Sequence, residues 1–525
     1  MLFNSFSFIF VFLPSVLLLF FWAARLRGHN LAVRILGAAS IFFYGWWDPA
    51  FLPFLLLSIV VNYAVGRGLG SALTDTYRRG LVVFGILLNL SALFYFKYAD
   101  FAVSNINQLT SWGWPMPRVT LPIGISFYTF TQIAYLVDAS RRLANEYRFD
   151  HYLLFVTYFP HLIAGPILHH SEMMPQFQRP QTYRLSWENI SVGLTMFTIG
   201  LFKKVVVADG IAAPYVAPVF LAAHMGGQPG FLESWAGALA YTFQLYFDFS
   251  GYSDMALGLS RMFNITLPLN FNSPYKAENI VEFWRRWHMT LSRFLRDYLY
   301  IPLGGNRLGV SRRYANLLAT MVLGGLWHGA NWTFVVWGAL HGFYLIINHA
   351  WINLRRQWFE ARRVPTGRGR RFLGLLVGRS ITFTAVVVGW TVFRSESIRD
   401  AMTLLKGMAG LNGFVLPWNW QGHLSRVPES ILQMFIFGDT PGFTGGSEVV
   451  WLLVLLGMVW IAPNTQEILR RHRPALNWQP EDRAIAAFQK LVWQPTLIWL
   501  AIISVGAVIS ISRLSAVSEF LYFQF

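Results

Sequence analysis

Histidines placed in apolar sequence are the residues of this chain whose type could do chemistry. His328 has glycines on both sides in the segment Gly324–Trp332, and His288 is a lone titratable group on the apolar face of the segment Glu278–Tyr300. An ionisable side chain in a membrane is costly unless it is paired or wetted, so each histidine is a candidate site. A neutral imidazole can take the proton from a hydroxyl that attacks a thioester carbonyl. His328 is the stronger candidate, and the alternative for both is a satisfied core histidine.

Other catalytic patterns are missing from the sequence. It contains no H-x-x-x-H, no Walker A pattern, no G-x-S-x-G and no G-x-G-x-x-G. A metal site usually needs three or four closely spaced ligands, and the adjacent His169 and His170 would point apart on a helix. The 525 residues include no cysteine, so a thiol nucleophile is impossible within the chain. We therefore expect no bound metal, and any acyl group must be handled by another residue type.

The spacing of His328 and His341 raises a question of geometry. On one continuous helix, thirteen steps would turn the two side chains to nearly opposite faces, roughly 20 Å apart. They could share one site only if the chain breaks between them. The Gly329–Asn331 stretch is where such a break is conceivable.

Two carboxylates, Asp248 and Asp254, lie at the end of a long apolar run. Six helical steps of about 100° place them on different sides of a straight helix, so a catalytic dyad is not expected. The sequence Ser250–Ser253 between them could break the helix. We favour a structural role, in which the carboxylates hold an arginine or a helix end in place.

The segment Glu278–Tyr300 is predicted to be an amphipathic helix. Its apolar face is formed, at steps of three and four residues, by Val281, Trp284, His288, Leu291 and Leu295. Glu282 with Arg286, and Arg293 with Asp297, are expected to form ion pairs one turn apart. An interfacial helix lying at the membrane surface is the alternative explanation for its arginines.

A bundle of membrane helices must position these residues. Hydrophobic residues make up 55% of the chain and charged residues 13%, against about 25% charged in soluble domains. A soluble protein of this size could not bury so much apolar surface. Counted against the ~20 residues that a straight span needs, the apolar runs predict an all-α polytopic membrane protein with about 10–12 transmembrane or re-entrant helices.

Charge gives the expected orientation of the helices. Residues 1–24 carry no charge and are followed by Arg25 and Arg27, the reverse of a signal peptide, so they predict a first span with its N-terminus outside. The net charge of +17 is explained by basic cytoplasmic loops rather than by nucleic acid. The basic segment 355–379 is expected inside, and attraction of nucleotide phosphates is its alternative role. The loop 394–448, with five acidic and four basic residues, is expected outside.

Five segments of the chain resemble motifs of the membrane-bound O-acyltransferase family. They are Tyr158–Ile167, Tyr246–Ala256, Glu282–Ser292, Arg296–Arg307 and Gly324–Gly329. Their order and spacing are similar to the family's, and the resemblance extends nearly end to end. Within the family, the sequence is most similar to the membrane proteins of alginate O-acetylation.

The resemblance implies a fold and a set of site residues. The fold is a helical bundle around a funnel or tunnel, in a single domain over residues 1–525 with the catalytic motifs in 246–345. His328 matches the catalytic histidine, near the narrowest point, and His288 matches a second histidine of the bacterial members. Substrate or tunnel-lining positions are implied for Asp248, Arg285, Arg286, Trp327 and Asn331.

The resemblance also implies a reaction. An enzyme of this kind moves acetyl from cytoplasmic acetyl-CoA across the bacterial inner membrane, for O-acetylation of an exported polysaccharide such as alginate. His328 would be a general base or a transient acyl carrier. Acetyl-CoA is the donor cosubstrate, and no permanently bound cofactor is implied. The implied partners are the lipid bilayer, a periplasmic acetyltransferase of the SGNH or serine-esterase type, and the polysaccharide.

Three alternatives stay open. One is a structural scaffold that only docks polysaccharide machinery, which a buried histidine framed by Gly and Trp disfavours. Relatives that transfer D-alanine to a wall polymer share the histidines, so D-alanyl transfer is the nearest alternative. A proton-coupled transporter could also use buried histidines, although the lack of an internal repeat disfavours it. The sequence leaves open the acceptor, the oligomeric state and the choice between direct transfer and an acetyl-histidine intermediate.

Overall fold

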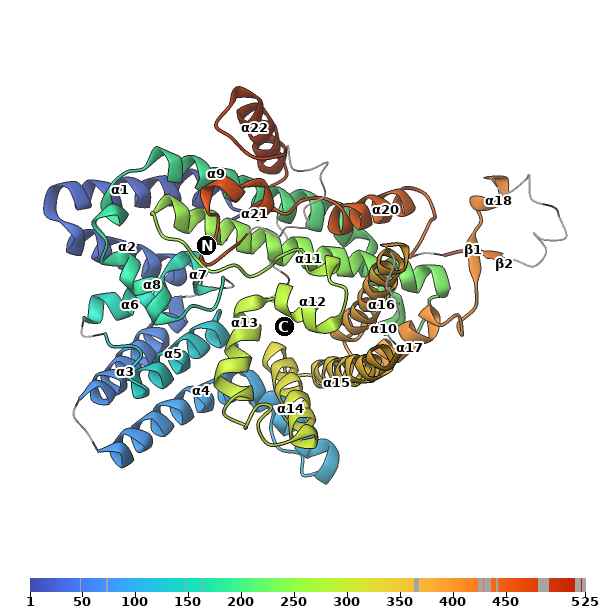
Figure 1. Cartoon of the computed structure of the whole chain (residues 1–525), viewed down its shortest axis with the longest axis horizontal. Coiled ribbons are helices and arrows are strands. Elements are labelled where there is room, and N and C mark those ends of the chain that lie inside the picture. The colour runs from blue at the N-terminus through green and yellow to red at the C-terminus, as the bar shows by residue number, and fades with distance from the viewer. Residues whose placement is uncertain are drawn as a thin grey trace. The chain divides into compact units, whose positions relative to one another are not determined.

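The computed structural model describes residues 1–47, 49–71, 74–146, 148–163, 165–362, 368–423, 428, 436–440, 442–479, 491–514 and 521. Nearly all secondary structure in these ranges is helical (Figure 1). Two short strands, β1 (Val415–Pro417) and β2 (Ile436–Gly438), pair in parallel. The predicted all-α class is therefore confirmed.

Six segments of the described chain are long and apolar enough to cross a membrane. They are Ser7–Arg27, Pro49–Gly70, Asp75–Thr110, Trp187–His224, Trp332–Gln357 and Phe372–Arg394. Large apolar side chains such as Leu18, Phe84 and Ile347 stay exposed on them. Lipid can cover such surface, whereas water would penalise it. The protein is thus a polytopic membrane protein, while the count of 10–12 helices, which included re-entrant segments, stays a prediction.

Contacts along the chain define two compact units, and each is described by itself. The first unit comprises Met1–Phe202, Ser250–Asn270 and Thr465–Gln524. Its helices in chain order are η1 (Ser7–Phe12), α1 (Leu13–Arg27), α2 (His29–Gly45), η2 (Pro49–Phe51), α3 (Leu52–Gly70), α4 (Asp75–Thr110), α5 (Ile125–Ser140), α6 (Phe149–Thr157), α7 (Phe159–Leu162), α8 (His170–Phe177), η3 (Pro180–Tyr183), α9 (Trp187–Phe202), α21 (Thr465–Ile468), η8 (Arg470–His472) and α22 (Leu497–Ser512). The span predicted at residues 1–24 is observed as η1 and α1.

The second unit comprises Lys203–Phe249 and Phe271–Asn464. Its helices in chain order are η4 (Lys203–Ala212), η5 (Ala213–Tyr215), α10 (Ala217–His224), η6 (Pro274–Lys276), α12 (Ile280–Arg286), α13 (Met289–Leu295), η7 (Arg296–Tyr300), α14 (Val310–His328), α15 (Trp332–Arg362), α16 (Arg368–Arg394), α17 (Ile398–Met408), α18 (Trp420–His423) and α20 (Ser447–Trp460). One further helix, α11 (Phe231–Met262), contributes residues to both units. The single domain predicted over residues 1–525 stays a prediction.

Glycines let α9 and the C-terminal half of α11 approach closely in the first unit. A methyl group on Gly193 would overlap the carbonyl oxygen of Gly258, and one on Gly200 would overlap that of Gly251. Small residues at such contacts bring two helix backbones together. The helix break expected at Ser250–Ser253 is wrong, because α11 is continuous there and Gly251 serves packing.

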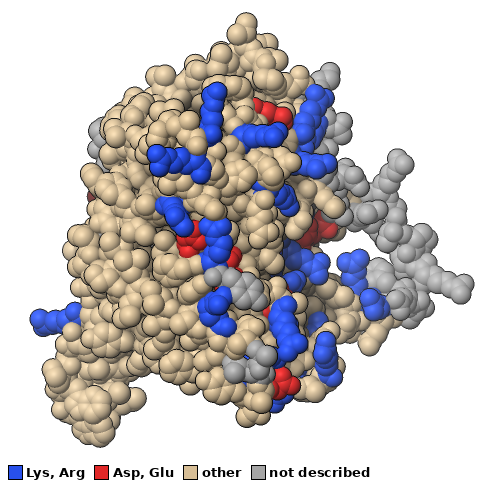
Figure 2. Space-filling view, turned by 90° about the vertical axis from the view of Figure 1, so that its left-hand side faces the viewer, with Lys and Arg blue, Asp and Glu red and all other residues tan. Residues whose placement is uncertain are grey.

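Basic side chains are more common than acidic ones on the face shown in Figure 2, where large areas carry neither. The predicted basic segment 355–379 spans the end of α15 and the start of α16. Residues 363–367 of that segment lie outside the described residues. The inside location of this segment and the outside location of the loop 394–448 stay predictions.

Candidate active site

His288 lies at a sharp break between two short helices of the second unit. α12 ends before it, α13 begins after it, and its own φ is 42°, in the left-handed region. The expectation of one helix over Glu278–Tyr300 is therefore wrong, because Trp287 is extended and His288 reverses the chain. A left-handed residue other than glycine is strained and persists only where its surroundings hold it.

Aromatic rings enclose the His288 side chain, which is fully buried. Its ring centroid lies 4.8 Å from that of Phe249, 6.3 Å from that of Phe271 and 6.2 Å from that of Trp327. The ring of His328 is 6.5 Å away. Burial lowers the pKa of His288, which lies outside the six spanning segments, to about 3. The imidazole is accordingly neutral at physiological pH.

His328 is the last residue of α14, directly before the chain turns. Gly329 is extended and α15 starts at Trp332, so the break that the sequence allowed is present. Glycines hold the two helices together, since a methyl group on Gly325 would overlap the carbonyl oxygen of Phe334. This tight hairpin fixes the position of His328 at its turn.

The hairpin brings His341 and His328 against the same aromatic ring, that of Trp337. The Trp337 centroid lies 5.3 Å from that of His328 and 4.9 Å from that of His341. His341 is fully buried, and neither of its ring nitrogens has a hydrogen-bond partner within the described part of the chain. The rings around it belong to Phe283, Trp284, Trp337, Tyr344 and Trp390.

We call His288, His328 and His341 the histidine cluster. The sequence predicts the first two as candidates and allows His341 to join them only if the chain breaks after His328. The helical arithmetic was correct for an unbroken helix, and the Gly329–Asn331 stretch was the signal that the helix does break. Trp327, also predicted, lies within the cluster, with its centroid 5.0 Å from that of His328.

Asp248 is held in a buried ion pair. Its carboxylate lies 2.5 Å from Nζ of Lys204, whose ammonium also contacts Asp209 at 3.0 Å. Asp254 instead accepts hydrogen bonds from Thr465 and Gln466, at 2.6 and 2.8 Å. The two carboxylates have separate partners, as the sequence predicted. The sequence predicts an arginine or a helix end as the partner of each carboxylate: Asp248 pairs with a lysine instead, and Asp254 binds the first two residues of α21.

Three other predicted residues have their side chains engaged elsewhere or exposed. Arg286 bonds Glu282 at 2.8 Å, which confirms the predicted ion pair, and also donates to the carbonyl of Asn272. Asn331 donates to the carbonyl of Glu396 and accepts from the amide of Thr333. Their substrate or tunnel-lining roles stay predictions.

The third of these residues, Arg285, is exposed, and its role also stays a prediction. The other predicted ion pair of this segment joined Arg293 to Asp297. In the structure Asp297 pairs with its neighbour Arg296 at 2.7 Å.

The chemistry that this arrangement supports is proton transfer by a neutral imidazole. Among the described residues no group of three or more His, Asp or Glu side chains could hold a metal ion. An imidazole in an apolar environment resists protonation until a substrate hydroxyl is acidified by attack on a carbonyl.

Comparison with known proteins points to acyl transfer in each case. Residues 47–388 match the model of the membrane-bound O-acyltransferase family, MBOAT. The chain is 41% identical to the peptidoglycan O-acetyltransferase of Helicobacter pylori over 472 residues, which cover 84% of this chain and 87% of that protein. It is 38% identical to the probable alginate O-acetylase AlgI of Pseudomonas putida over the full length of both. A teichoic acid D-alanyltransferase of Streptococcus thermophilus is 28% identical over 52% of this chain and 68% of that protein.

Proposed function

The chain belongs to the membrane-bound O-acyltransferase family, and on that premise we propose that it transfers acetyl from cytoplasmic acetyl-CoA for O-acetylation of an exported polysaccharide. Family membership confirms the resemblance carried by the five motif segments. It also makes the chain a multi-pass membrane O-acyltransferase. The donor, the acceptor, the location in a bacterial inner membrane and the residue roles are the proposed part.

The meeting of His288 and His328 at 6.5 Å between aromatic rings is the observation that carries the proposed chemistry. The acceptor hydroxyl oxygen attacks the thioester carbonyl carbon, and its proton passes to the ring nitrogen of His328. The carbon–sulfur bond then breaks, and the departing sulfur takes that proton, giving an ester and a free thiol. General base catalysis of this kind contributes roughly 10²–10⁴-fold. In the alternative route His328 carries the acetyl group transiently.

Acetyl is favoured over D-alanyl by the extent of the matches. The alignment with the alginate O-acetylase of Pseudomonas putida covers the whole of both chains, whereas the D-alanyltransferase matches 52% of this one. Alginate or a related polysaccharide, reached directly or through a periplasmic SGNH-type partner, is the acceptor that this similarity supports. D-alanyl transfer remains the second candidate because the relative carries that name.

Thiol release from acetyl-CoA by the purified full-length protein in detergent tests the proposal. Wild type, His328→Ala and His349→Ala would be assayed with and without alginate oligosaccharide, and the O-acetylated product measured. His349 lies on α15, as His341 does, but it is not part of the histidine cluster. The His349 variant therefore controls for the loss of a histidine. We expect His328→Ala to lose release and His349→Ala to keep it. Full activity in His328→Ala would overturn the residue assignment.

The same assay separates the candidate donors. Release from a D-alanyl thioester but not from acetyl-CoA would replace the acetyl proposal with D-alanyl transfer. Flux of a solute without thioester consumption would favour the transporter, which family membership argues against.

A further inference from the structure

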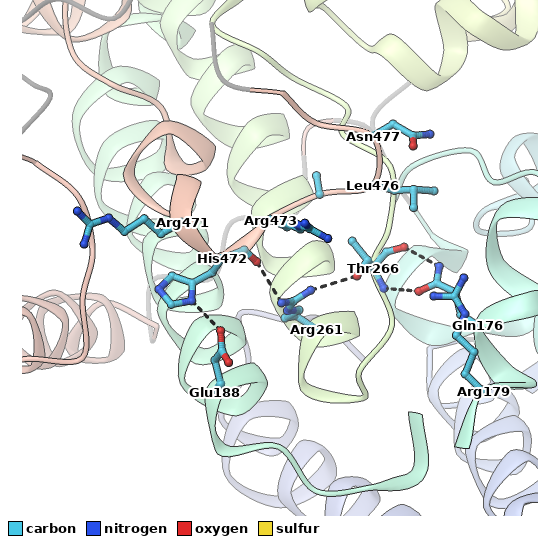
Figure 3. Close-up of a pocket in the computed structure, with 11 residues that line it drawn as sticks. Gln176, Arg179, Glu188, Arg261, Thr266, Arg471, His472, Arg473, Leu476 and Asn477 are labelled. Carbon is cyan, nitrogen blue, oxygen red and sulfur yellow. Dashed lines mark hydrogen bonds and ion pairs between the residues drawn. The ribbon is translucent and has the colours of Figure 1, made fainter. Parts of the chain in front are cut away.

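A basic cavity in the first unit is lined by none of the residues to which we assign a role in the acyl transfer. Its volume is about 580 Å³, and its walls come from α8, the start of α9, the end of α11 and the segment around η8 (Figure 3). Four arginines line it, against the single carboxylate of Glu188. They are Arg179, Arg261, Arg471 and Arg473. We call this space the arginine cavity.

The described residues around the arginine cavity neutralise its charges poorly. Nδ1 of His472 lies 2.8 Å from the Glu188 carboxylate, so that carboxylate is already engaged. Within the ranges that the structure describes, the side chains of Arg179, Arg471 and Arg473 make no ion pair or hydrogen bond. Like charges gathered around one hollow repel each other unless an anion lies among them.

One of the four guanidiniums is oriented by the protein. Arg261 donates to Thr266 Oγ1 at 3.2 Å and to the carbonyl of His472 at 3.1 Å, while its buried Nε has no partner among the described residues. Gln176 fixes Thr266 in turn, through two hydrogen bonds of 2.9 Å to its backbone. Figure 3 shows Arg261 and Arg473 between His472 and Thr266, with Arg471 pointing away from them. The cavity therefore has a fixed wall and arginines that can adjust.

The cavity lies at the end of the first unit that the charge pattern assigns to the cytoplasm. Arg25 and Arg27 end α1, and His29, which opens α2, stacks on Tyr183 with ring centroids 4.0 Å apart. Asn264, three residues after Arg261, donates to the carbonyls of the adjoining residues 182 and 184. The arginine cavity thus belongs to the same end as the basic α1–α2 turn.

We propose that the arginine cavity binds a phosphate group at the cytoplasmic end of the first unit. A guanidinium presents a planar fork of donors that matches two phosphate oxygens. The volume exceeds that of a bare phosphate and leaves room for the group attached to it. Both the headgroup of an anionic phospholipid and a soluble phosphorylated molecule offer this chemistry. The proposal does not depend on the donor or acceptor of the acyl transfer.

Binding of two defined probes to the full-length protein tests the proposal. For the soluble source, protein in dodecyl maltoside would be titrated calorimetrically with inorganic pyrophosphate at low salt. For the lipid source, protein would be presented with nanodiscs of phosphatidylglycerol and phosphatidylcholine, and the co-purifying lipid measured. Surface electrostatics weaken as salt rises, so a bound phosphate should also be released more readily at high salt.

The decisive variant is Arg179→Gln/Arg473→Gln, because neither side chain makes an ion pair or hydrogen bond with another described residue. The matched control is Arg25→Gln/Arg27→Gln, which removes two exposed charges at the same end of the unit. We expect the first double variant to bind at least about 10-fold more weakly, since a hydrogen bond to a charged group contributes about 1.5–3 kcal/mol. The control should change binding less than about threefold, and the melting temperatures of both should match the wild type.

Pyrophosphate binding lost in the decisive variant supports a soluble phosphate ligand. Enrichment of phosphatidylglycerol lost only in that variant supports a lipid headgroup. The proposal is overturned if neither probe prefers the wild type to the decisive variant, or if the control loses binding equally.

Discussion

Two groups of buried polar side chains in this protein are held in opposite ways. On α11, Asp248 pairs with Lys204, and Asp254 receives hydrogen bonds from Thr465 and Gln466. The histidine cluster is enclosed by aromatic rings instead, and His341 has no hydrogen-bond partner among the described residues.

The two groups serve different purposes. The carboxylates of α11 stabilise the fold, whereas the histidine cluster is available to react with a substrate. A buried carboxylate that is bonded to a lysine cannot change its charge without destabilising the fold. An imidazole between aromatic rings can act as a base toward a substrate hydroxyl. The comparison therefore predicts that substitution of Asp248 on α11 acts on stability, and substitution of His328 in the histidine cluster acts on activity.

The largest effect is expected for His328→Ala. Acetyl transfer should fall by roughly 10²–10⁴-fold, because the proposed general base is removed. The melting temperature should change little, because His328 is the last residue of α14 and alanine is well tolerated in a helix. Initial rates with acetyl-CoA, beside thermal melts in detergent, would check both. A large drop in melting temperature would instead show that His328 is needed for folding, as Asp248 is expected to be.

Asp248→Leu should show the opposite pattern, with a loss of about 3–5 kcal/mol in the free energy of unfolding. The substitution leaves the ammonium of Lys204 buried after losing its more buried partner, while the less buried Asp209 stays beside it. Denaturation in detergent would measure the loss. The double variant Lys204→Met/Asp248→Leu removes both charges and should recover most of the stability. A double variant as unstable as the single one would show that the ion pair is not the cause.

Glu146 is a buried carboxylate outside the six spanning segments and, like those of α11, it is held by hydrogen bonds. Burial alone would raise its pKa, but hydrogen bonds from His151 and His170 outweigh burial and lower the pKa to about 2. The unfolded value is 4.5, so this stabilisation is present above about pH 4.5 and is lost as the pH falls towards 2.

Glu146→Gln should therefore be less stable than wild type at pH 7, with the difference shrinking by pH 3.5. Thermal melts at the two pH values provide the measurement. A difference that is independent of pH would mean that the Glu146 charge does not contribute.

The smallest effect is expected for His341→Phe. A phenyl ring can take the place of an imidazole that makes no hydrogen bond to the described residues, so stability should change by less than about 1.5 kcal/mol, as in other shape-conserving core substitutions. Activity should stay within about threefold of wild type, because His341 has no proposed role in proton transfer. A loss comparable with that of His328→Ala would instead add His341 to the catalytic group.

Local patterns predicted the membrane class, the first span and the Glu282–Arg286 pair, because composition and short spacing determine them. The break at His288 was missed because the apolar periodicity continues from Val281 to Leu295 across it. Its left-handed backbone is set by rings from elsewhere in the second unit, which periodicity does not report.

Long-range pairing was also beyond the sequence. Lys204 precedes Asp248 by 44 residues, so nothing in the local spacing identifies it as the partner. The arginine cavity collects residues from segments that begin at Gln176 and end at Asn477. None of its arginines stands out as a motif.

The glycine contacts of the α14–α15 hairpin have a consequence for genetics. Any side chain at Gly325 or Gly338 meets backbone of the opposite helix and must push the helices apart. His328 would then move relative to Trp337 although no functional group had been altered. In an unbiased screen for inactive alleles, these two glycines should therefore be found as often as the histidines themselves.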